Sequence, residues 1–303
     1  MVVNIAGVHK HFKGSNKSHV KALNGLDLAL EQGEILGLFG HNGAGKTTTI
    51  KLILGLYHPT QGQVQVLGKN PVTHPSIKQN IGFLPENVQF YEPLTGREAL
   101  HYFARLKGVS IQQANQLLKK FDLDFAADRS IKGYSKGMRQ RLGLAQAMLG
   151  EPKLLLLDEP TVGLDPVATK QFYEHVAMLQ SHGCTLIICS HVLPGIESYI
   201  DKALIMQKGH CVAQGSVAEL NAQAQLPVEI DVMGEHEPVV MPEEVKRITT
   251  QQGWRLWVPA EQHVQVLKSL GEQSDVQGGM RGLFSKAPSL EDLYHHFMSK
   301  PAQ

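Results

Sequence analysis

Nine residues, GHNGAGKTT from Gly40 to Thr48, constrain the fold of this chain more than any other stretch of it. They fit the pattern G-x-x-x-x-G-K-[ST], in which glycines let backbone N–H groups point inward around a phosphate. The run Glu34–Phe39 before them reads as a buried strand, and the residues from Lys46 onward have helical spacing. A tight turn before a helix would not require Lys-Thr after its last glycine. We therefore predict a phosphate-binding loop (P-loop) made of Gly40, His41, Asn42, Gly43, Ala44, Gly45, Lys46, Thr47 and Thr48.

Two acids, Asp158 and Glu159, follow another apolar run in LLLLDEP. An acid pair after an apolar strand is often only a strand end, but downstream of a P-loop it is expected to handle a metal ion and water. We predict that Asp158 and the Thr47 hydroxyl hold Mg²⁺, and that Glu159 polarises the attacking water. Lys46 would supply positive charge to the phosphates. The chemistry expected is phosphoryl transfer to water.

A single histidine, His191, comes directly after a third apolar run, TLIICS. A histidine at this point can reach the γ-phosphate side of the P-loop and respond to loss of that phosphate. If it stood alone, we would interpret it as a satisfied histidine at a strand end. Its place in the chain, after the P-loop and the acid pair, favours a catalytic role.

Apolar runs and helical stretches alternate along the rest of the chain, which predicts a parallel α/β core. Gly62–Gly68 alternates apolar and polar residues, as an antiparallel strand outside the main sheet would. The signals over about 90–150 are mostly helical and indicate a helical insertion. We predict a nucleotide-binding domain over residues 1–220 and a small α+β accessory domain over 221–303.

Composition argues against several classes of protein. The 303 residues carry 29 Lys and Arg against 28 Asp and Glu, and this balance argues against the basic face that broad nucleic-acid binding needs. The N-terminus lacks the apolar core of a signal peptide, and no apolar run approaches the ~20 residues of a membrane helix. Any membrane role is therefore expected to go through a partner. The three cysteines, Cys184, Cys189 and Cys211, form no CxxC pair and are expected to be reduced.

Five motifs, GHNGAGKTT, YSKGM, LLLLDE, VGLD and SH, stand in an order and at spacings that resemble those of ABC-transporter ATPase subunits. The resemblance covers about residues 2–220. It implies an ABC-type P-loop NTPase with a RecA-like parallel sheet core, an antiparallel β subdomain and a helical subdomain, to which the small C-terminal α+β region is added. It also implies ATP hydrolysis, with ATP and Mg²⁺ as the cofactors.

The resemblance also explains why a second candidate phosphate-binding loop, YSKGM, precedes the acid pair. In that family the corresponding loop binds the ATP that the other subunit holds. Ser135 and the N–H of Gly137 would then meet the γ-phosphate across a head-to-tail dimer interface. Because one chain has one copy of each loop, the resemblance implies a homodimer or a paired ATPase partner.

Other positions carry over from the family one at a time. Phe12 stands where an aromatic ring stacks on adenine, although a core phenylalanine on an edge strand is the alternative. Asp165 in VGLD matches the loop that couples the two nucleotide sites. Glu86 replaces the usual Gln but can still contact Mg²⁺ or water. Tyr134 and Lys136 replace the more usual Leu and Gly of the YSKGM loop.

One branch of the family is most similar in its motifs, the ATPase subunit of the copper-processing transporter for maturation of bacterial nitrous-oxide reductase. GFLPENVQFYEPLTGREALHYFARLKG and CSHVLPGIES carry this finer resemblance. It implies a cytoplasmic dimer, peripheral on the inner face of the cell membrane, bound to an integral-membrane permease and with a periplasmic accessory subunit beyond. The alternatives are a generic exporter of a drug, lipid or polysaccharide, a soluble ABC ATPase, and a binding module that ATP only regulates.

Overall fold

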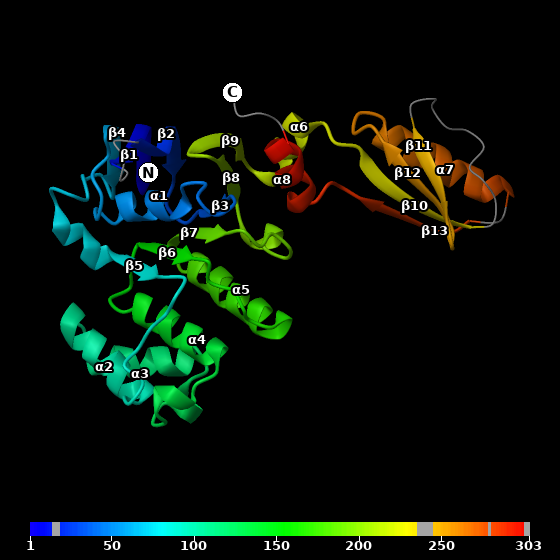
Figure 1. Ribbon diagram of the computed structural model, residues 1–303. Helices are drawn as coiled ribbons and strands as arrows, with labels where there is room; N and C mark the ends of the chain where they lie inside the picture. The colour runs from blue at the N-terminus through cyan, green and yellow to red at the C-terminus, as the bar shows by residue number, and fades with distance from the viewer. Residues whose placement is uncertain (14–18, 235–244, 278–279, 300–303) are drawn as a thin grey trace. The chain divides into compact units, whose positions relative to one another are not determined.

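The computed structural model describes residues 1–13, 19–234, 245–277 and 280–299 (Figure 1). Its elements group into two compact units, Met1–Ser216 and Val217–Pro301. Each unit has its own hydrophobic core among the described residues. The first unit contains all of the motifs that the sequence singled out.

A six-stranded sheet with the order β5-β6-β7-β3-β8-β9 forms the centre of the first unit (Figure 1). Neighbouring strands pair in parallel, except for the antiparallel pair β8 and β9. β3, β6 and β7 are buried along their whole length, as strands covered on both faces of a parallel sheet must be. The strands are β3 (Ile35–Phe39), β5 (Ile81–Leu84), β6 (Leu154–Asp158), β7 (Thr185–Ser190), β8 (Lys202–Gln207) and β9 (His210–Gly215).

Three of the predicted motifs leave this sheet at the same edge. β3 and β6 both pair in parallel with β7, so that the carboxyl ends of the three strands lie side by side. Phe39, the last residue of β3, pairs with Ser190, and Asp158, the last residue of β6, pairs with Cys189. The P-loop, the acid pair and His191 therefore start from one edge, where open parallel sheets bind their ligands.

A three-stranded antiparallel sheet, in the order β2-β1-β4, lies outside the central sheet. Val64 and Val66 in β4 are buried while their neighbours are exposed, which matches the predicted alternation. Residues of this sheet share one core with α1 and with the central strands. The elements are β1 (Val3–Lys13), β2 (His19–Leu30), β4 (Gln61–Val66) and α1 (Lys46–Ile53).

The predicted helical insertion is present, and side chains in the sequence fix where its helices begin. Thr95 and Glu98 form a capping box at the start of α2, and Ser110 and Ser135 cap α3 and α4. The helices are α2 (Gly96–Lys107), α3 (Ile111–Lys120) and α4 (Lys136–Ala147), with short 3₁₀ turns at Asp124–Ala126 and Ile131–Gly133. Outside the insertion, α5 (Pro166–Ser181) connects β6 to β7, and 3₁₀ turns cover Pro75–Asn80 and Glu197–Tyr199.

The second unit is an antiparallel sheet with the order β11-β12-β10-β13, together with three helices. Its core contains Ile230, Leu256, Val266 and Leu270, which come from β10, β12 and α7. Ser289 caps α8 by accepting a hydrogen bond from the Asp292 N–H at 3.2 Å. The elements are α6 (Val217–Ala224), β10 (Val228–Gly234), β11 (Lys246–Thr250), β12 (Gly253–Val258), α7 (His263–Gln277), β13 (Met280–Lys286) and α8 (Leu290–Ser299).

Candidate functional site

The P-loop connects the end of β3 to the start of α1, and its glycines have the backbone conformations that the motif requires. Gly43 and Gly45 have φ angles of 82° and 115°, in the region that favours glycine. A Cβ on Gly45 would lie 2.7 Å from the Leu23 side chain and 2.9 Å from the carbonyl oxygen of Ala22. The loop can therefore close tightly only with glycine here, and it presents its N–H groups at the N-terminus of α1.

The P-loop lines a cavity of about 460 Å³. Glu86, Glu159 and His191 line the same cavity, so the structure brings together these three predicted catalytic residues and the P-loop. Val20, Lys21 and Ala22 of β2 also line it. These three residues were not predicted from the sequence, because no motif marks the point at which an antiparallel strand passes a P-loop.

Thr47 and Asp158 meet at the bottom of this site. The Thr47 hydroxyl donates to Asp158 Oδ2 at 3.2 Å, while the buried Asp158 Oδ1 has no hydrogen-bond partner among the described residues. Burial raises the pKa of Asp158, and the negative charges of Glu159 and Glu86 add to the rise, whereas the Thr47 hydrogen bond opposes it. A hydroxyl, an unsatisfied carboxylate oxygen and excess negative charge fit a hard divalent cation such as Mg²⁺.

Glu159 is held on both of its carboxylate oxygens. Oε1 lies 3.2 Å from Lys46 Nζ, and Oε2 lies 2.8 Å from His191 Nδ1 and 3.2 Å from the His191 N–H. Lys46 Nζ also donates to the carbonyl oxygen of Gly40 at 2.6 Å. The Glu159 side chain is 6% exposed, and its φ of 49° is unusual for a residue with a side chain. Such strain persists only where the surroundings fix it, and it is typical of functional sites.

Ser135, Gly137 and Asp165 lie together, but in a different cavity. This second hollow has a volume of about 560 Å³ and is lined by the start of α4 and the loop before α5. No P-loop residue is among the described residues that line it. Ser135 Oγ accepts from the Met138 N–H at 3.2 Å, so the hydroxyl lies at the N-terminus of α4. One protomer therefore separates its P-loop cavity from the cavity around Ser135.

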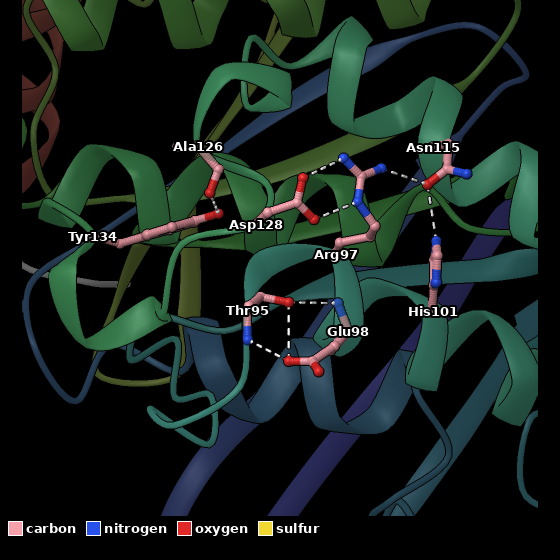
Figure 2. A network of polar contacts seen from close by, with 8 residues as sticks. All are labelled: Thr95, Arg97, Glu98, His101, Asn115, Ala126, Asp128 and Tyr134. Carbon is pink, nitrogen blue, oxygen red and sulfur yellow. Dashed lines mark hydrogen bonds and ion pairs between the residues drawn. The ribbon is translucent and has the colours of Figure 1, made fainter.

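Tyr134 fixes the loop that begins α4. Its hydroxyl donates to the carbonyl oxygen of Ala126 at 2.8 Å, and its side chain is buried (Figure 2). A Cβ on Gly96, the first residue of α2, would overlap the Tyr134 hydroxyl oxygen. Tyrosine in place of the more usual leucine is thus matched to a glycine that lies far away in the sequence.

A polar network stiffens the same region (Figure 2). Arg97 donates to both carboxylate oxygens of Asp128, at 2.7 and 3.0 Å, and to Asn115 Oδ1 at 3.0 Å. Asn115 Oδ1 also lies 2.8 Å from His101 Nε2. The network joins α2 and α3 to the turn before the Tyr134 loop.

Phe12 has a position that differs from those of the other predicted site residues. It is not among the residues that line the P-loop cavity. Its ring meets Tyr57 edge to face with 5.2 Å between centroids, and Lys10 Nζ lies 4.9 Å from the centre of the Phe12 ring. The structure therefore places Phe12 in an aromatic and cationic cluster beside the P-loop helix.

A P-loop at the edge of a buried parallel sheet, with a carboxylate–hydroxyl pair below it, defines a P-loop nucleoside triphosphatase. A sequence model of the family described as ABC transporter matches residues 23–162. The chain is 39% identical over 207 residues to an uncharacterized ABC transporter ATP-binding protein of Synechocystis sp., covering 66% of this chain and 58% of the relative. It is 32% identical over 285 residues to the ABC transporter ATP-binding protein YhaQ of Bacillus subtilis, covering 90% and 92%. It is 35% identical over 227 residues to the bacitracin transport ATP-binding protein BcrA of Bacillus licheniformis, covering 74% of each.

Solved structures agree with these sequence matches. The structure of an ATP binding subunit of an ABC transporter superposes with a TM-score of 0.65 at 30% identity, covering 74% of this chain and 93% of that one. A dimeric bacterial ABC transporter cassette gives a TM-score of 0.65 at 22% identity, covering 71% and 98%, and this likeness concerns the fold alone. The chain belongs to the ABC transporter ATP-binding proteins. The predicted fold class, the ABC-type ATPase class and the use of ATP with Mg²⁺ are confirmed at the level of the family.

Proposed function

We propose that this chain is the ATP-hydrolysing subunit of a membrane transporter and works as a head-to-tail homodimer. The observation that carries the proposal is the separation of two half-sites in one protomer, the P-loop cavity and the cavity lined by Ser135, Gly137 and Asp165. The two half-sites make one complete site only when the second comes from another protomer. Asp165, which lines the second half-site, then couples the two composite sites.

Each residue of the P-loop cavity has a distinct task in this proposal. The P-loop N–H groups and Lys46 bind the phosphates. Thr47 and Asp158 would hold Mg²⁺, which would supply positive charge to the phosphate oxygens. Glu159 orients the attacking water, because one of its oxygens is fixed by Lys46 and the other by His191. Glu86, which lines the same cavity, would contact the metal or its water.

The nucleotide base needs a separate contact. Phe12 would stack on adenine, and its ring has to turn from Tyr57 toward the P-loop cavity for this. Val20, Lys21 and Ala22 already line the side of the cavity that β2 forms.

Closure follows from differential binding. ATP touches two protomers in the closed dimer and one in the open state, so it favours closure by the free energy of the added contacts. Each charge-assisted hydrogen bond lost with the γ-phosphate is worth about 1.5–3 kcal/mol, so that a few such bonds are enough to switch the interface.

The membrane role is assigned to a partner. Among the described residues, no helix combines the length and the apolar character that a membrane crossing needs. The relatives support a transporter ATPase that pairs with an integral-membrane permease, at the cytoplasmic face of the membrane. A periplasmic accessory subunit is implied only by the resemblance to the copper-processing branch.

The relatives support a generic exporter better than they support the copper-processing transporter for nitrous-oxide reductase. The relative BcrA is named for bacitracin transport, and none of the relatives described above is named for copper or for that enzyme. Purification of the complex from native membranes tests the choice. A permease alone supports the generic exporter, whereas a permease with a periplasmic copper-site protein supports the copper branch.

The direct test of the ATPase role is Glu159→Gln. The variant leaves the contacts of the P-loop and Lys46 with phosphate in place, but its amide cannot accept a proton from water. We therefore expect normal ATP binding, an ATP-stabilised dimer and turnover reduced by at least about 10²-fold. Size-exclusion chromatography with light scattering and a phosphate-release assay measure these properties. Hydrolysis at the parent rate would show that Glu159 is not the water-orienting residue.

A further inference from the structure

Two of the family's usual residues are replaced by charged ones in this chain, at Glu86 and Lys136, where Gln and Gly are more usual. The fold brings these two positions to one place. Both line a cavity of about 510 Å³ between the loop after β5 and the start of α4. The replacements have opposite charge, so they leave the charge of this hollow balanced.

Neither charge has a partner among the residues that the structure describes. Glu86 and Lys136 make no hydrogen bond or ion pair with any residue that the structure describes, and both are exposed. Arg139 also lines this hollow, but its guanidinium lies 3.3 Å from Glu92 and donates to the carbonyl oxygen of Lys132 at 3.3 Å. Of the two cations among the described residues that line this hollow, Lys136 is therefore the one not already engaged. The P-loop cavity, which Glu86 also borders, adds Lys21 and Lys46, and Lys46 is engaged by Glu159.

The position of Lys136 on its helix favours an anion close to it. Lys136 is the first residue of α4, and the first turn of that helix contains no acid. The positive end of the helix dipole disfavours a cation there unless an anion compensates. The Lys136 ammonium lies over Gly163, where a Cβ would overlap it, and Gly163 has a φ of 72°. The side chain is thus held at the junction of the α4 start and the loop before α5.

Glu86 in turn needs a nearby cation. It lines the P-loop cavity together with Glu159, and its charge acts on the buried Asp158. Three carboxylates around a triphosphate repel one another and the phosphates. Glu86 borders both the P-loop cavity and the hollow that contains Lys136, so a cation in the hollow offsets part of this repulsion.

We propose that Glu86 and Lys136 are an electrostatic pair that positions the Ser135–Gly137 loop relative to the P-loop cavity of the same protomer. The pair links the loop that faces this protomer's own nucleotide to the loop that faces the partner's nucleotide. This inference rests on the proposed head-to-tail dimer. Both are positioning residues here, since they act through the Ser135–Gly137 loop, and Glu86 keeps its separate contact with the metal or its water.

A double-mutant cycle on the full-length chain tests the pair. Glu86→Gln and Lys136→Met remove the charges with little change of size, and the double variant removes both. The half-saturating ATP concentration and kcat are measured separately for all four proteins, together with the dimer dissociation constant in ATP. Lys136→Arg is the conservative variant. Lys132→Met in place of Lys136→Met gives a matched control cycle, because Lys132 is an exposed lysine near the same loop and does not line the hollow.

If the two charges interact, the effects of the single variants on ATP binding and on dimerisation should not multiply in the double variant. We expect the double variant to bind ATP and to dimerise roughly 2- to 10-fold better than the product of the two single effects, as for coupled neighbours. The non-additivity should shrink at about 1 M salt, where the Debye length is ~3 Å, and Lys136→Arg should preserve the parent behaviour. Additive effects of Glu86→Gln and Lys136→Met, or equal non-additivity in the Lys132 control cycle, would contradict the proposed pairing of Glu86 with Lys136. Absence of ATP-dependent dimerisation in the parent protein would instead overturn the proposed function on which it rests.

Discussion

Lys46 is a buried, charged residue, and its burial is a direct sign that the P-loop is built to bind an anion. It is 5% exposed, and its ammonium is satisfied by the Gly40 carbonyl oxygen and by Glu159. A lysine is almost never buried unless it is paired. The pairing holds the Lys46 ammonium in the loop before the nucleotide binds, so the side chain loses little conformational entropy on binding.

Lys46→Ala should therefore weaken ATP binding by about 10-fold or more, the equivalent of one lost charge-assisted hydrogen bond. Titration calorimetry with ATP in the presence of Mg²⁺ measures the change. Lys51→Ala, on the same helix but near the Tyr57 ring, is the control and should bind ATP as the parent does. Equal weakening in the two variants would show that the effect comes from α1 rather than from the Lys46 charge.

Asp158 illustrates a conflict between stability and function in one side chain. Its pKa is raised mainly by burial. For an acid whose folded-state pKa is raised, the associated stability is fully present below the unfolded pKa and is lost as pH rises through the folded pKa. The nucleotide-free protein at neutral pH therefore carries the cost of an ionised, partly desolvated carboxylate.

Asp158→Asn should raise the thermal midpoint of the nucleotide-free protein at pH 7 and abolish Mg²⁺-dependent hydrolysis. The stability gain should shrink as pH falls and disappear below about 4, the ordinary pKa of aspartate, because the parent is then protonated in both states. Differential scanning calorimetry over this pH range is the measurement. A variant that is less stable than the parent at every pH would contradict the account.

At the scale of elements, the start of α4 depends on a contact that no local pattern could predict. The sequence shows that Tyr134 replaces the leucine that is more usual in the family. The hydrogen bond from its hydroxyl to Ala126 and its close packing against Gly96 are visible only in the structure. The caps at Thr95, Ser110 and Ser289, in contrast, are local, and side-chain chemistry marks them in the sequence.

A cycle at Gly96 and Tyr134 tests this fit. Tyr134→Phe should lower the free energy of unfolding by about 1 kcal/mol, through loss of one buried hydrogen bond. Gly96→Ala should cost more, because its methyl group would overlap the hydroxyl oxygen. The double variant should cost less than the sum, since phenylalanine lacks that oxygen. Urea denaturation provides the values, and strict additivity would show that the two residues do not meet.

Strands and their order were predictable to different degrees. β3, β6 and β7 stand out as continuous apolar runs, because both faces of a parallel sheet are covered. β11 has exposed residues along most of its length and so gives no alternating signal. The order of the central sheet was not predicted, since pairing of strands far apart in sequence leaves no mark in either strand.

At the scale of the whole molecule, the motifs predict phosphate, metal and water contacts, and the family resemblance implies that the Ser135–Gly137 loop serves a different nucleotide from the P-loop. The structure places the two groups in separate cavities of one protomer. The Lys46–Glu159–His191 chain of contacts is visible only in the structure. Phe12 could be selected only by its place in the chain, and its packing against Tyr57 was not predictable from it.

Mixing two inactive variants tests the central claim, that one protomer's Ser135–Gly137 loop completes the other's P-loop site. Lys46→Ala disables the P-loop. Gly137→Asp places a negative charge toward the γ-phosphate, and a Cβ there meets its neighbours only at 3.8 Å or more, so the helix should tolerate it. Each variant alone should be nearly inactive, whereas in the mixed dimer one site has both an intact P-loop and an intact partner loop. The account predicts that mixing restores ATP hydrolysis; a mixture no more active than its two components, although mixed dimers form, would contradict it.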